Sequence, residues 1–389
     1  MTSRTRWIVL LISTPVVVFV IVGGLLGRAS AKEGSYPHLR IFEDVMSLIL
    51  GSYVETVDVD KVMDGAMRGL AEGLDADSAY LTPEQAKLFE KPDTQATGTT
   101  GIELTRQYYL RVIAARDGSP AAKAGIQTGD SLRAINDAPT RNMSAVEGMR
   151  LLNGPAGSKV KLTLLRESLS DPHEVTLVRE APQSGNDVSG RAHTAGVGYV
   201  RIAAFGPNVA SRIASQVTTL QRGGAASLVI DLRGTAQGAL ADGIAAARLF
   251  VSAGTLSSRE GRGDGKVVHQ ANKGDGKIAL PVVLLSSNGT SGAAEVFTAA
   301  LIDNKRATLV GEHTLGRAAE QKLVKLPDGS ALWMTSARYL APSGAVIHGT
   351  GLKPSVEVAQ PDVDFGAAPP TDDPILDKAL EQIGLKKAA

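Results

Sequence analysis

Apolar residues recur at intervals of one to four between residues 36 and 90, with a clear periodic run at 62–74. This spacing predicts a mainly helical segment. Residues 74–81 interrupt the pattern and are expected to form a loop. Thr82 followed by Pro83 then has the composition of an N-cap and a first helical position, which predicts the start of another helix.

The pattern changes near Thr97, where short β-like runs replace the helical periodicity. Gly, Pro and Asp separate these runs as far as residue 180, and one helical run at 144–152 interrupts them. Several strands and a helix within about 85 residues predict a small α+β module. The predicted strands are residues 110–114, 160–165 and 174–178.

Beyond a predicted linker at 183–187, strands alternate with helices. Such alternation predicts parallel βαβ units, with helices packed on the faces of the sheet. From Asp362 the chain reads as a loop until an amphipathic helix at 373–383. The predicted strands are 198–203, 227–232, 279–285 and 308–310, and the predicted helices are 208–222, 239–250 and 293–303.

A chain of 389 residues exceeds the size at which one core stops growing, so several domains are expected. The predicted fold class is a multidomain α+β protein. Its segments are an N-terminal anchor or signal peptide at 1–31, a helical region at 32–96, the α+β module at 97–182, the α/β core at 183–361 and a tail at 362–389.

The N-terminus predicts export from the cytoplasm. Residues 7–26 carry no charge and are long enough to span a bilayer as a helix. Arg4 and Arg6 precede them, which predicts that the N-terminus stays inside and the bulk faces the periplasm or the extracellular side. Residues 29–31 (Ala-Ser-Ala) also fit a cleavage site, so a secreted form is the alternative. The length of the apolar run favours an uncleaved, single-pass anchor.

Composition narrows the chemistry further. Lys and Arg total 41 against 40 for Asp and Glu, and this balance gives no sign of nucleic-acid binding. Cysteine is absent, which excludes disulfides, zinc thiolate sites and a cysteine nucleophile. The six histidines include no pair at metal-ligand spacing. We therefore expect neither a metal nor a cofactor.

The α+β module contains a series of motifs whose order and spacing resemble the signature of a bacterial PDZ domain. Gly125 is expected to end a short helix that Pro120 begins, and Gly129 with Asp130 to turn the chain into a strand. The motifs are Gly118-Ser119-Pro120-Ala121, Ala124-Gly125-Ile126 and Gly129-Asp130-Ser131-Leu132, with Ile135 and Asn136 behind them.

This resemblance implies a groove that binds C-terminal peptide segments of other proteins. In such a groove the peptide adds to a sheet edge, and backbone N–H groups hold its terminal carboxylate. The corresponding loop is Thr100, Gly101, Ile102, Glu103 and Leu104. The family usually has a glycine at the position of Glu103. A carboxylate near the anion pocket is expected to weaken binding by repulsion.

The motifs of the third segment resemble the C-terminal processing, or tail-specific, serine peptidase family. The resemblance covers about residues 36–360 and implies a ClpP/crotonase-like α/β core. The motifs are Asp231-Leu232-Arg233-Gly234, Leu284-Leu285-Ser286-Ser287-Asn288-Gly289, Ala293-Ala294-Glu295, Asp303-Asn304-Lys305-Arg306-Ala307 and Val310-Gly311-Glu312-His313-Thr314-Leu315-Gly316, with residues 74–81, 341–344 and 351–354 also matching.

Those peptidases use a Ser–Lys pair, in which a neutral lysine takes the proton of the serine and a glutamine helps to orient the lysine. Family spacing, counted from Glu295, places the nucleophile at Gly292 and the base at Arg317. The glutamine is kept as Gln321, and the Asp303 position is also kept.

Both reacting groups are therefore absent. Glycine has no nucleophile, and a guanidinium does not give up its proton in proteins. A third departure lies at residues 235–238, where Thr-Ala-Gln-Gly replaces the Asn-x-Gly-Gly turn common near the oxyanion site. The sequence thus favours a protein that binds tails without the standard catalysis. Replacing Gly292 by serine and Arg317 by lysine is predicted to create proteolysis.

An active serine endopeptidase that degrades or trims envelope proteins is the alternative. It would use Ser291, one residue before the nucleophile position, near the N-terminus of the following helix. The nearby candidate bases, none at the family spacing, are His313, Lys305, Lys322 and Lys325. The simpler interpretation is that Ser291 caps this helix. A structural scaffold at the membrane, with both grooves unused, is a third reading.

Overall fold

The computed structural model describes residues 36–89, 96–166, 171–182, 187–194, 196–361, 363–365, 367 and 370–388. The chain divides between Ala66 and Met67 into two compact units. Helix α2 (Tyr36–Ser52) belongs to the first, and α3 (Val59–Glu72) runs across the boundary, which confirms the predicted helices. Within these described ranges no helix has the length and apolar composition to cross a bilayer. The anchor predicted at 7–26 lies outside them and stays a prediction.

Helix α4 (Pro83–Phe89) begins where the sequence predicts it. The backbone N–H of Gln85 donates to Thr82 Oγ1 at 3.4 Å, and Gln85 Oε1 accepts from the backbone N–H of Thr82 at 3.0 Å. This reciprocal pair is a capping box, which satisfies N–H groups that the first helical turn leaves without partners.

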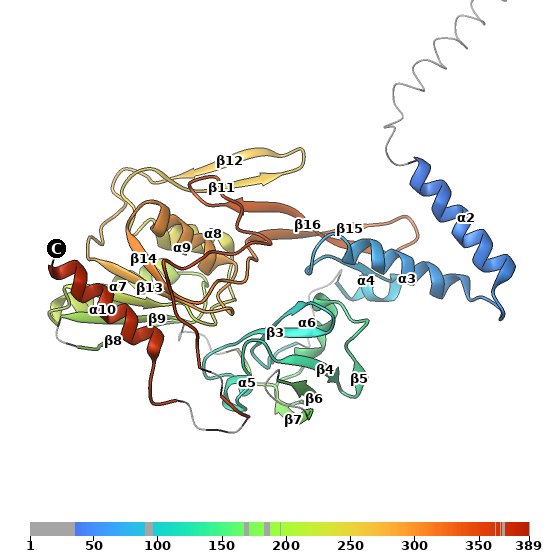
Figure 1. Ribbon diagram of the computed structural model, residues 1–389, viewed down its shortest axis with the longest axis horizontal. Coiled ribbons are helices and arrows are strands. Elements are labelled where there is room, and N and C mark those ends of the chain that lie inside the picture. Colours follow the sequence, from blue (N-terminus) through green and yellow to red (C-terminus); the bar gives the residue numbers. More distant parts are fainter. Residues whose placement is uncertain are drawn as a thin grey trace, which may run out of the picture. The chain divides into compact units, whose positions relative to one another are not determined.

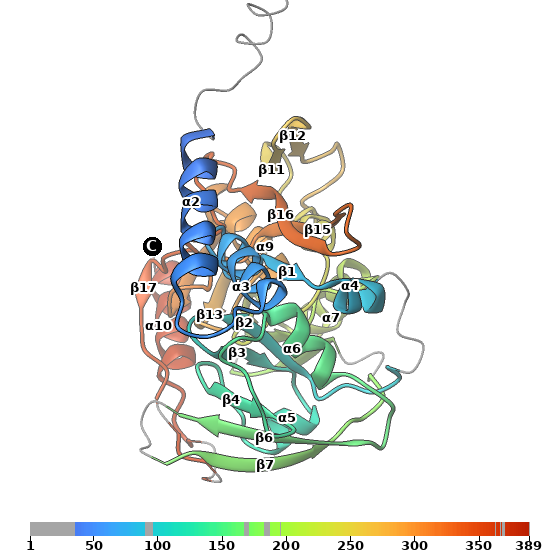
Figure 2. The same ribbon diagram turned by 90° about the vertical axis from the view of Figure 1, so that its right-hand side faces the viewer.

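Residues 96–166 and 171–182 form an antiparallel sheet in the order β2-β3-β4-β6-β7 (Figure 2). Strand β5 pairs with β4. Helix α6 (Ala145–Leu152) packs against β2, and the short α5 (Pro120–Lys123) is capped by Ser119. The strands are β2 (Ile102–Arg106), β3 (Leu110–Ala115), β4 (Ser131–Ile135), β5 (Ala138–Pro139), β6 (Lys159–Leu165) and β7 (His173–Val178).

The second sheet has six strands in the order β17-β14-β13-β10-β9-β8 (Figure 1). Its pairs are parallel except for β8 with β9, so the predicted βαβ pattern is confirmed. The strands are β8 (Val188–Ala192), β9 (Val197–Ile202), β10 (Ser227–Asp231), β13 (Val282–Ser286), β14 (Ala307–Gly311) and β17 (Val356–Glu357). The helices are α7 (Val209–Arg222), α8 (Leu240–Ala247), α9 (Ala293–Asp303) and α10 (Pro374–Ala388).

Both faces of this parallel sheet are covered. In β10, Leu228 and Ile230 join the cluster that includes α7, α8 and α9, whereas Val229 joins the cluster that includes α10. Successive strand residues point to opposite faces, so a strand covered on both sides must be apolar throughout. The functional loops follow the carboxyl ends of these strands, where ligands of open α/β sheets usually bind.

A third, antiparallel sheet was not predicted. Its order is β1-β16-β11-β12, and β15 also pairs with β16. Residues 79–81, predicted as part of a loop, instead form β1 and pair with β16 in register. The strands are β1 (Ala79–Leu81), β11 (Thr255–Gly261), β12 (Gly265–Gln270), β15 (Ala319–Lys325) and β16 (Ala331–Leu340). Strand β12 is almost wholly exposed, so its sequence lacks the apolar alternation that marks a half-buried strand.

Candidate active site

The turn between β13 and α9 ends at Gly292, the predicted nucleophile position. Gly292 is the N-cap of α9, with φ 63° and ψ −119°, a backbone conformation that residues with a Cβ rarely adopt. Thr290 Oγ1 holds the turn by donating to the carbonyl of Leu232 at 2.8 Å and accepting from the N–H of Ser287 at 3.0 Å. A strained strand-to-helix turn is also how other hydrolases present a serine nucleophile. The turn is thus present without the hydroxyl.

Glu295 joins this turn to the loop that carries the predicted base position. It is fully buried, and its carboxylate accepts from the backbone N–H groups of Gly292 (2.9 Å), Gly316 (2.6 Å) and Arg317 (2.7 Å) and from Thr314 Oγ1. Burial raises the pKa of Glu295, and these four donors oppose that rise. Glu295 therefore fixes the distance between Gly292 and Arg317, the predicted nucleophile and base positions.

Arg317, at the predicted base position, is an ion-paired cation. Its Nε donates to Asp77 Oδ2 at 2.9 Å, and its NH1 lies 4.0 Å from Glu103 Oε2. The Asp77 side chain is 6% exposed and that of Arg317 25% exposed, so most of the pair is shielded from water. Two carboxylates here stabilise a positive charge where the standard mechanism needs a neutral amine.

The loop at 235–238 and the loop of Arg317 border Gly292. A Cβ placed on Gly292 would lie 3.9 Å from the carbonyl oxygen of Ala236 and 3.9 Å from that of Arg317. There is thus room for a side chain beside these two carbonyl groups. In the loop at 235–238, Gln237 Nε2 donates to Glu103 Oε1 at 2.9 Å.

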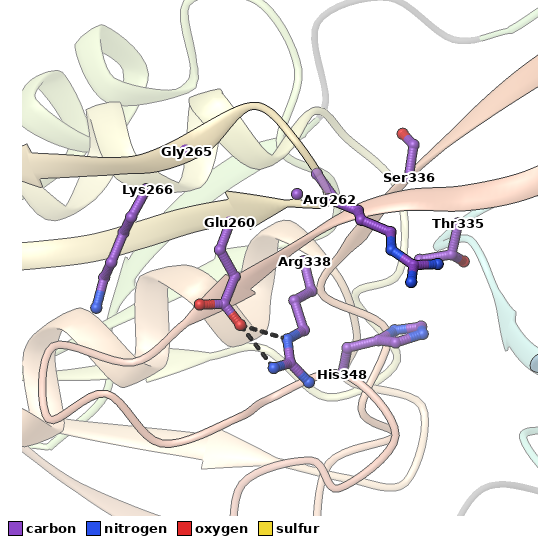
Figure 3. A pocket seen from close by; sticks show the side chains of 10 residues that line it. Glu260, Arg262, Gly265, Lys266, Thr335, Ser336, Arg338 and His348 are labelled. Carbon is purple, nitrogen blue, oxygen red and sulfur yellow. Dashed lines mark hydrogen bonds and ion pairs between the residues drawn. The ribbon is translucent and has the colours of Figure 1, made fainter. Parts of the chain in front are cut away.

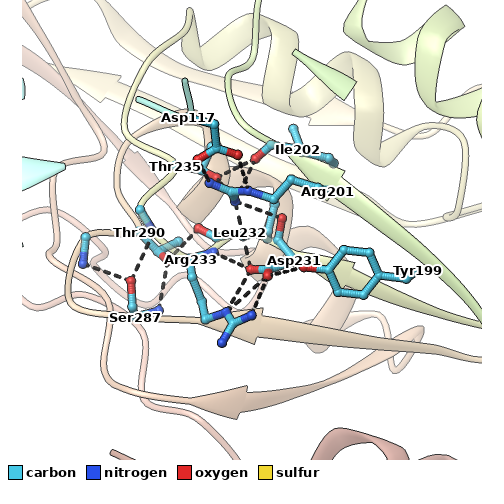
Figure 4. A network of polar contacts seen from close by, with 12 residues as sticks. Asp117, Tyr199, Arg201, Ile202, Asp231, Leu232, Arg233, Thr235, Ser287 and Thr290 are labelled. Atoms are coloured by element: carbon cyan, nitrogen blue, oxygen red, sulfur yellow. Dashed lines mark hydrogen bonds and ion pairs between the residues drawn. The ribbon is translucent and has the colours of Figure 1, made fainter. Parts of the chain in front are cut away.

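A buried polar network anchors the loop at 235–238 at its start (Figure 4). Asp231 accepts from Tyr199 Oη at 2.6 Å and from Arg233 NH2 at 2.7 Å, and Arg201 NH1 lies 3.9 Å away. Burial alone would raise the pKa of Asp231, but the charges and hydrogen bonds of Arg201, Arg233 and Tyr199 hold it below its ordinary value. Arg233 also bonds Asp373, next to α10, at 2.8 Å, so the network ties the loop to the core.

Among the described residues, strand β2 has a partner strand on one side only, and its other edge lies beside α6. This is the geometry in which an extended peptide adds to a sheet. Gly101, before β2, has φ 79°, and a Cβ there would lie 2.2 Å from Ser119 Cβ, so only glycine fits. Ile102 and Leu104 are buried in the module, whereas Glu103 points the other way, to Gln237.

Comparison with known proteins agrees with both predicted modules. A PDZ domain model matches residues 111–166, and the model of peptidase family S41 matches residues 196–358. The carboxy-terminal processing protease CtpA of Bacillus subtilis (strain 168) is 30% identical over 341 residues, which cover 87% of this chain and 72% of that protein. The chain belongs to peptidase family S41, the carboxy-terminal processing proteases.

Other relatives of this S41 chain agree. The carboxy-terminal-processing protease of Bartonella bacilliformis is 30% identical over 336 residues, covering 85% of this chain and 77% of that protein. Among solved structures, the photosystem II D1 C-terminal processing protease has a TM-score of 0.67 and 26% identity, covering 82% of this chain and 92% of that one. The family resemblance predicted from the motifs is confirmed.

Ser291 and Gln321 are two other candidate site residues predicted from the S41 motifs. Ser291 is 1% exposed, and its Oγ has no hydrogen-bond partner among the described residues, the candidate bases included. It does not cap α9, because the cap is Gly292. Gln321 lies on β15 and is predicted to be the family's glutamine, but its buried Nε2 also lacks a partner within the described part of the chain. The kept Asp303 has a structural contact, accepting from the N–H of Ser343 at 2.9 Å.

A cavity of about 530 Å³ lies between the β11–β12 hairpin and β16 of the S41 core (Figure 3). Arg262 and Lys266 line it together with Arg338, whose Nε donates to Glu260 Oε1 at 2.7 Å. His348 closes one side, with Nε2 4.0 Å from Asp75 Oδ2. The lining mixes charges of both signs and includes neither Gly292 nor Arg317.

The sequence did not single out Asp77 as a functional residue, although it lies in the matched loop at 74–81. The backbone N–H groups of Asp77 and Ser78 donate to Asp75 Oδ1 at 2.9 and 2.7 Å, which fixes the direction of the Asp77 side chain. An arginine at a largely buried base position requires a carboxylate partner. That requirement is the signal that would have pointed to Asp77.

Proposed function

We propose that this S41 member binds the C-terminal tails of other proteins and does not cut them by the Ser–Lys mechanism of its family. The observation that supports this most directly is Arg317, which stands at the base position and pairs with Asp77. A fixed, paired cation cannot deprotonate a nucleophile. Gly292 supplies no nucleophile, and two carbonyl oxygens border the space beside it.

Binding is supported by the PDZ domain. The open edge of β2 offers backbone groups to an extended peptide, and Gly101 keeps the tight turn before it. Glu103 is engaged by Gln237 and lies near Arg317, so its charge is partly compensated. The repulsion of a peptide carboxylate expected from the sequence is therefore reduced.

The same proposal includes export. Residues 7–26 would hold the chain in the cytoplasmic membrane, with the PDZ domain and core facing the periplasm or the extracellular side, where the tails of envelope proteins are accessible.

Cell fractionation of the full chain and of residues 32–389 tests this location. Recovery of the full chain in the cytoplasmic fraction contradicts it.

Residues 32–389 are expected to leave unstructured proteins with apolar C-termini uncleaved, and Ser291→Ala should behave identically. Gel electrophoresis and mass spectrometry of the digests provide the measurement. Cleavage that Ser291→Ala abolishes would establish the alternative, an endopeptidase acting through Ser291. No observation favours that alternative, because Ser291 Oγ is buried without a partner among the described residues.

The double change Gly292→Ser with Arg317→Lys is expected to give no cleavage, whereas the sequence alone predicts that it creates proteolysis. A lysine introduced at position 317 would lie beside Asp77 and Glu103, and both carboxylates favour its protonated form. The same digestion assay applies. Turnover by the double variant would show that these carboxylates do not control the base position.

A free-carboxylate peptide with an apolar C-terminus is expected to bind the PDZ domain at least about tenfold more tightly than its amidated form, because amidation removes a charge-assisted set of hydrogen bonds. Titration calorimetry measures both. Gly101→Ala should weaken binding, whereas Gly157→Ala is the control: it also has positive φ but nothing within 4 Å of an added Cβ. Equal affinity for both peptide forms refutes carboxylate capture.

A further inference from the structure

Besides Gly292, three of the departures that the family resemblance implies lie in one cluster. They are Glu103 in the PDZ domain, Gln237 in the turn at 235–238 of the core, and Arg317 at the predicted base position. These positions are far apart in sequence, yet Gln237 donates to Glu103 at 2.9 Å, and Arg317 lies 4.0 Å from the same carboxylate. Asp77 completes the group through its 2.9 Å bond to Arg317.

We propose that these residues convert the former catalytic centre into a charge clasp that holds the PDZ domain on the peptidase core. The clasp is defined as Asp77, Glu103, Gln237 and Arg317. It links strand β2 of the PDZ domain to two loops of the core and to the loop before β1. It goes beyond the proposed tail binding and does not depend on it.

The charges explain why Arg317 is central to the clasp. Its guanidinium is the cation that faces two largely buried carboxylates, Asp77 at 6% and Glu103 at 17% side-chain exposure. Without it, two like charges would remain near each other in a poorly solvated site, which is strongly unfavourable. Arginine suits this position because its planar group carries several donors that reach two partners at once.

A bulge in the strand pairing at Glu103 directs its side chain toward the core. Opposite Glu103 and Leu104 the partner strand β3 contains an extra residue, because the register shifts between the pairs Glu103–Ala114 and Leu104–Val112. Such a bulge re-aims side chains locally. Glu103 points from this place into the core, while its strand keeps a free edge for a peptide.

The same face of the PDZ domain closes over the nucleophile turn. A Cβ on Gly289 would lie 2.5 Å from Thr128 Oγ1 and 2.6 Å from the carbonyl oxygen of Ile113, so the two domains touch backbone to backbone there. Away from the centre, Arg201 pairs with Asp117 at 2.8 Å, where Asp117 is half exposed. The clasp thus lies at the shielded side of the interface, and the Arg201 pair at its solvated rim.

Hydrogen exchange measured by mass spectrometry tests the clasp in residues 32–389. Arg317→Ala is expected to speed exchange about tenfold or more in strand β2 and in residues 287–292, because the 4.0 Å ion pair with Glu103 across the interface is lost and Glu103 and Asp77 are left unneutralised beside each other. Strand β7, on the far edge of the PDZ sheet, should keep its rate, which separates loosening of the interface from unfolding.

The decisive comparison is between Arg317→Ala and a triple variant that also removes the two carboxylate charges. Adding Asp77→Asn and Glu103→Gln to Arg317→Ala removes the repulsion and should bring exchange back toward that of the unchanged protein. Gln237→Ala keeps the Asp77–Arg317 pair and should speed exchange in β2 by a smaller factor; it decides the question if Arg317→Ala does not fold. Glu174→Gln is the matched control, since Glu174 pairs with Lys161 at 3.0 Å within the PDZ domain.

Unchanged exchange in Arg317→Ala, or equal exchange in the single and triple variants, would overturn the clasp. Neither outcome depends on a bound tail. A protein that fails to capture free-carboxylate peptides but shows the rescue pattern would refute the proposed function and keep the clasp.

Discussion

Glu295→Gln is expected to lower the free energy of unfolding by about 3 kcal/mol. The buried carboxylate accepts four hydrogen bonds, and the NH₂ group of a glutamine in its place would face hydrogen-bond donors instead of acceptors. The carboxylate holds Gly292, Gly316 and the backbone of Arg317, so the loss spreads to both former catalytic positions. Urea unfolding followed by circular dichroism measures the difference. Glu357→Gln, at an exposed position on β17, is the matched control and should change stability by less than about 0.5 kcal/mol.

The pH dependence of this difference has a defined sign. Burial raises the pKa of Glu295 in the folded chain, so its ionisation favours the unfolded state. The advantage of the natural residue over glutamine should therefore be largest at low pH. It should fall as pH rises from the pKa of an unfolded glutamate through the raised folded value. A difference that grows over this window would contradict the role assigned to burial.

Asp231→Asn is expected to cost about 3 kcal/mol, because it removes one partner of a buried charged network. Arg233 would keep Asp373 and Arg201 would keep Asp117, which limits the loss. The same urea unfolding applies. Tyr199→Phe is the comparison: it deletes one hydrogen bond to the same carboxylate and should cost only about 1 kcal/mol.

The stability difference between the natural protein and Asp231→Asn is expected to change with pH in the opposite direction. The pKa of Asp231 is lowered in the folded chain, so its ionised form stabilises the folded state. The gap between the natural protein and Asp231→Asn should be constant above the pKa of an unfolded aspartate, near 4. It should shrink as pH falls further toward the lowered folded value. A gap that persists undiminished there would mean that Asp231 acts by shape, not by charge.

These two acids show which parts of the family's centre remain in use. Glu295 and Asp231 keep their buried partners and hold the turn at Gly292 and the loop at 234–238 in place. The proposed function places Gly292 and Arg317 at the positions that would react. On that proposal the peptidase fold is retained for its geometry, while a cation and its carboxylate partners replace the reacting groups.

Much of the fold could be predicted from the chain alone. Strands such as β10 and β13 are covered on both faces, so their uninterrupted apolar runs mark them in the sequence. The order and spacing of the glycine and aspartate motifs identified the family, and they predict Gly292 and Arg317 at its nucleophile and base positions. Strands β11, β12 and β15 were missed, because strand pairing stabilises them without an apolar alternation: β11 and β15 pair with β16, and β12 pairs with β11.

The sequence by itself determined the family and predicted, from the family's spacing, that Gly292 and Arg317 stand in place of the nucleophile and the base. Only the tertiary structure decided which residues surround them. Asp77, Glu103, Gln237 and Arg317 are separated by up to 240 residues, and no local pattern relates them. They meet because β1 joins the sheet of β16 while the PDZ domain packs on the nucleophile turn, which forces a buried arginine and two carboxylates to neutralise one another.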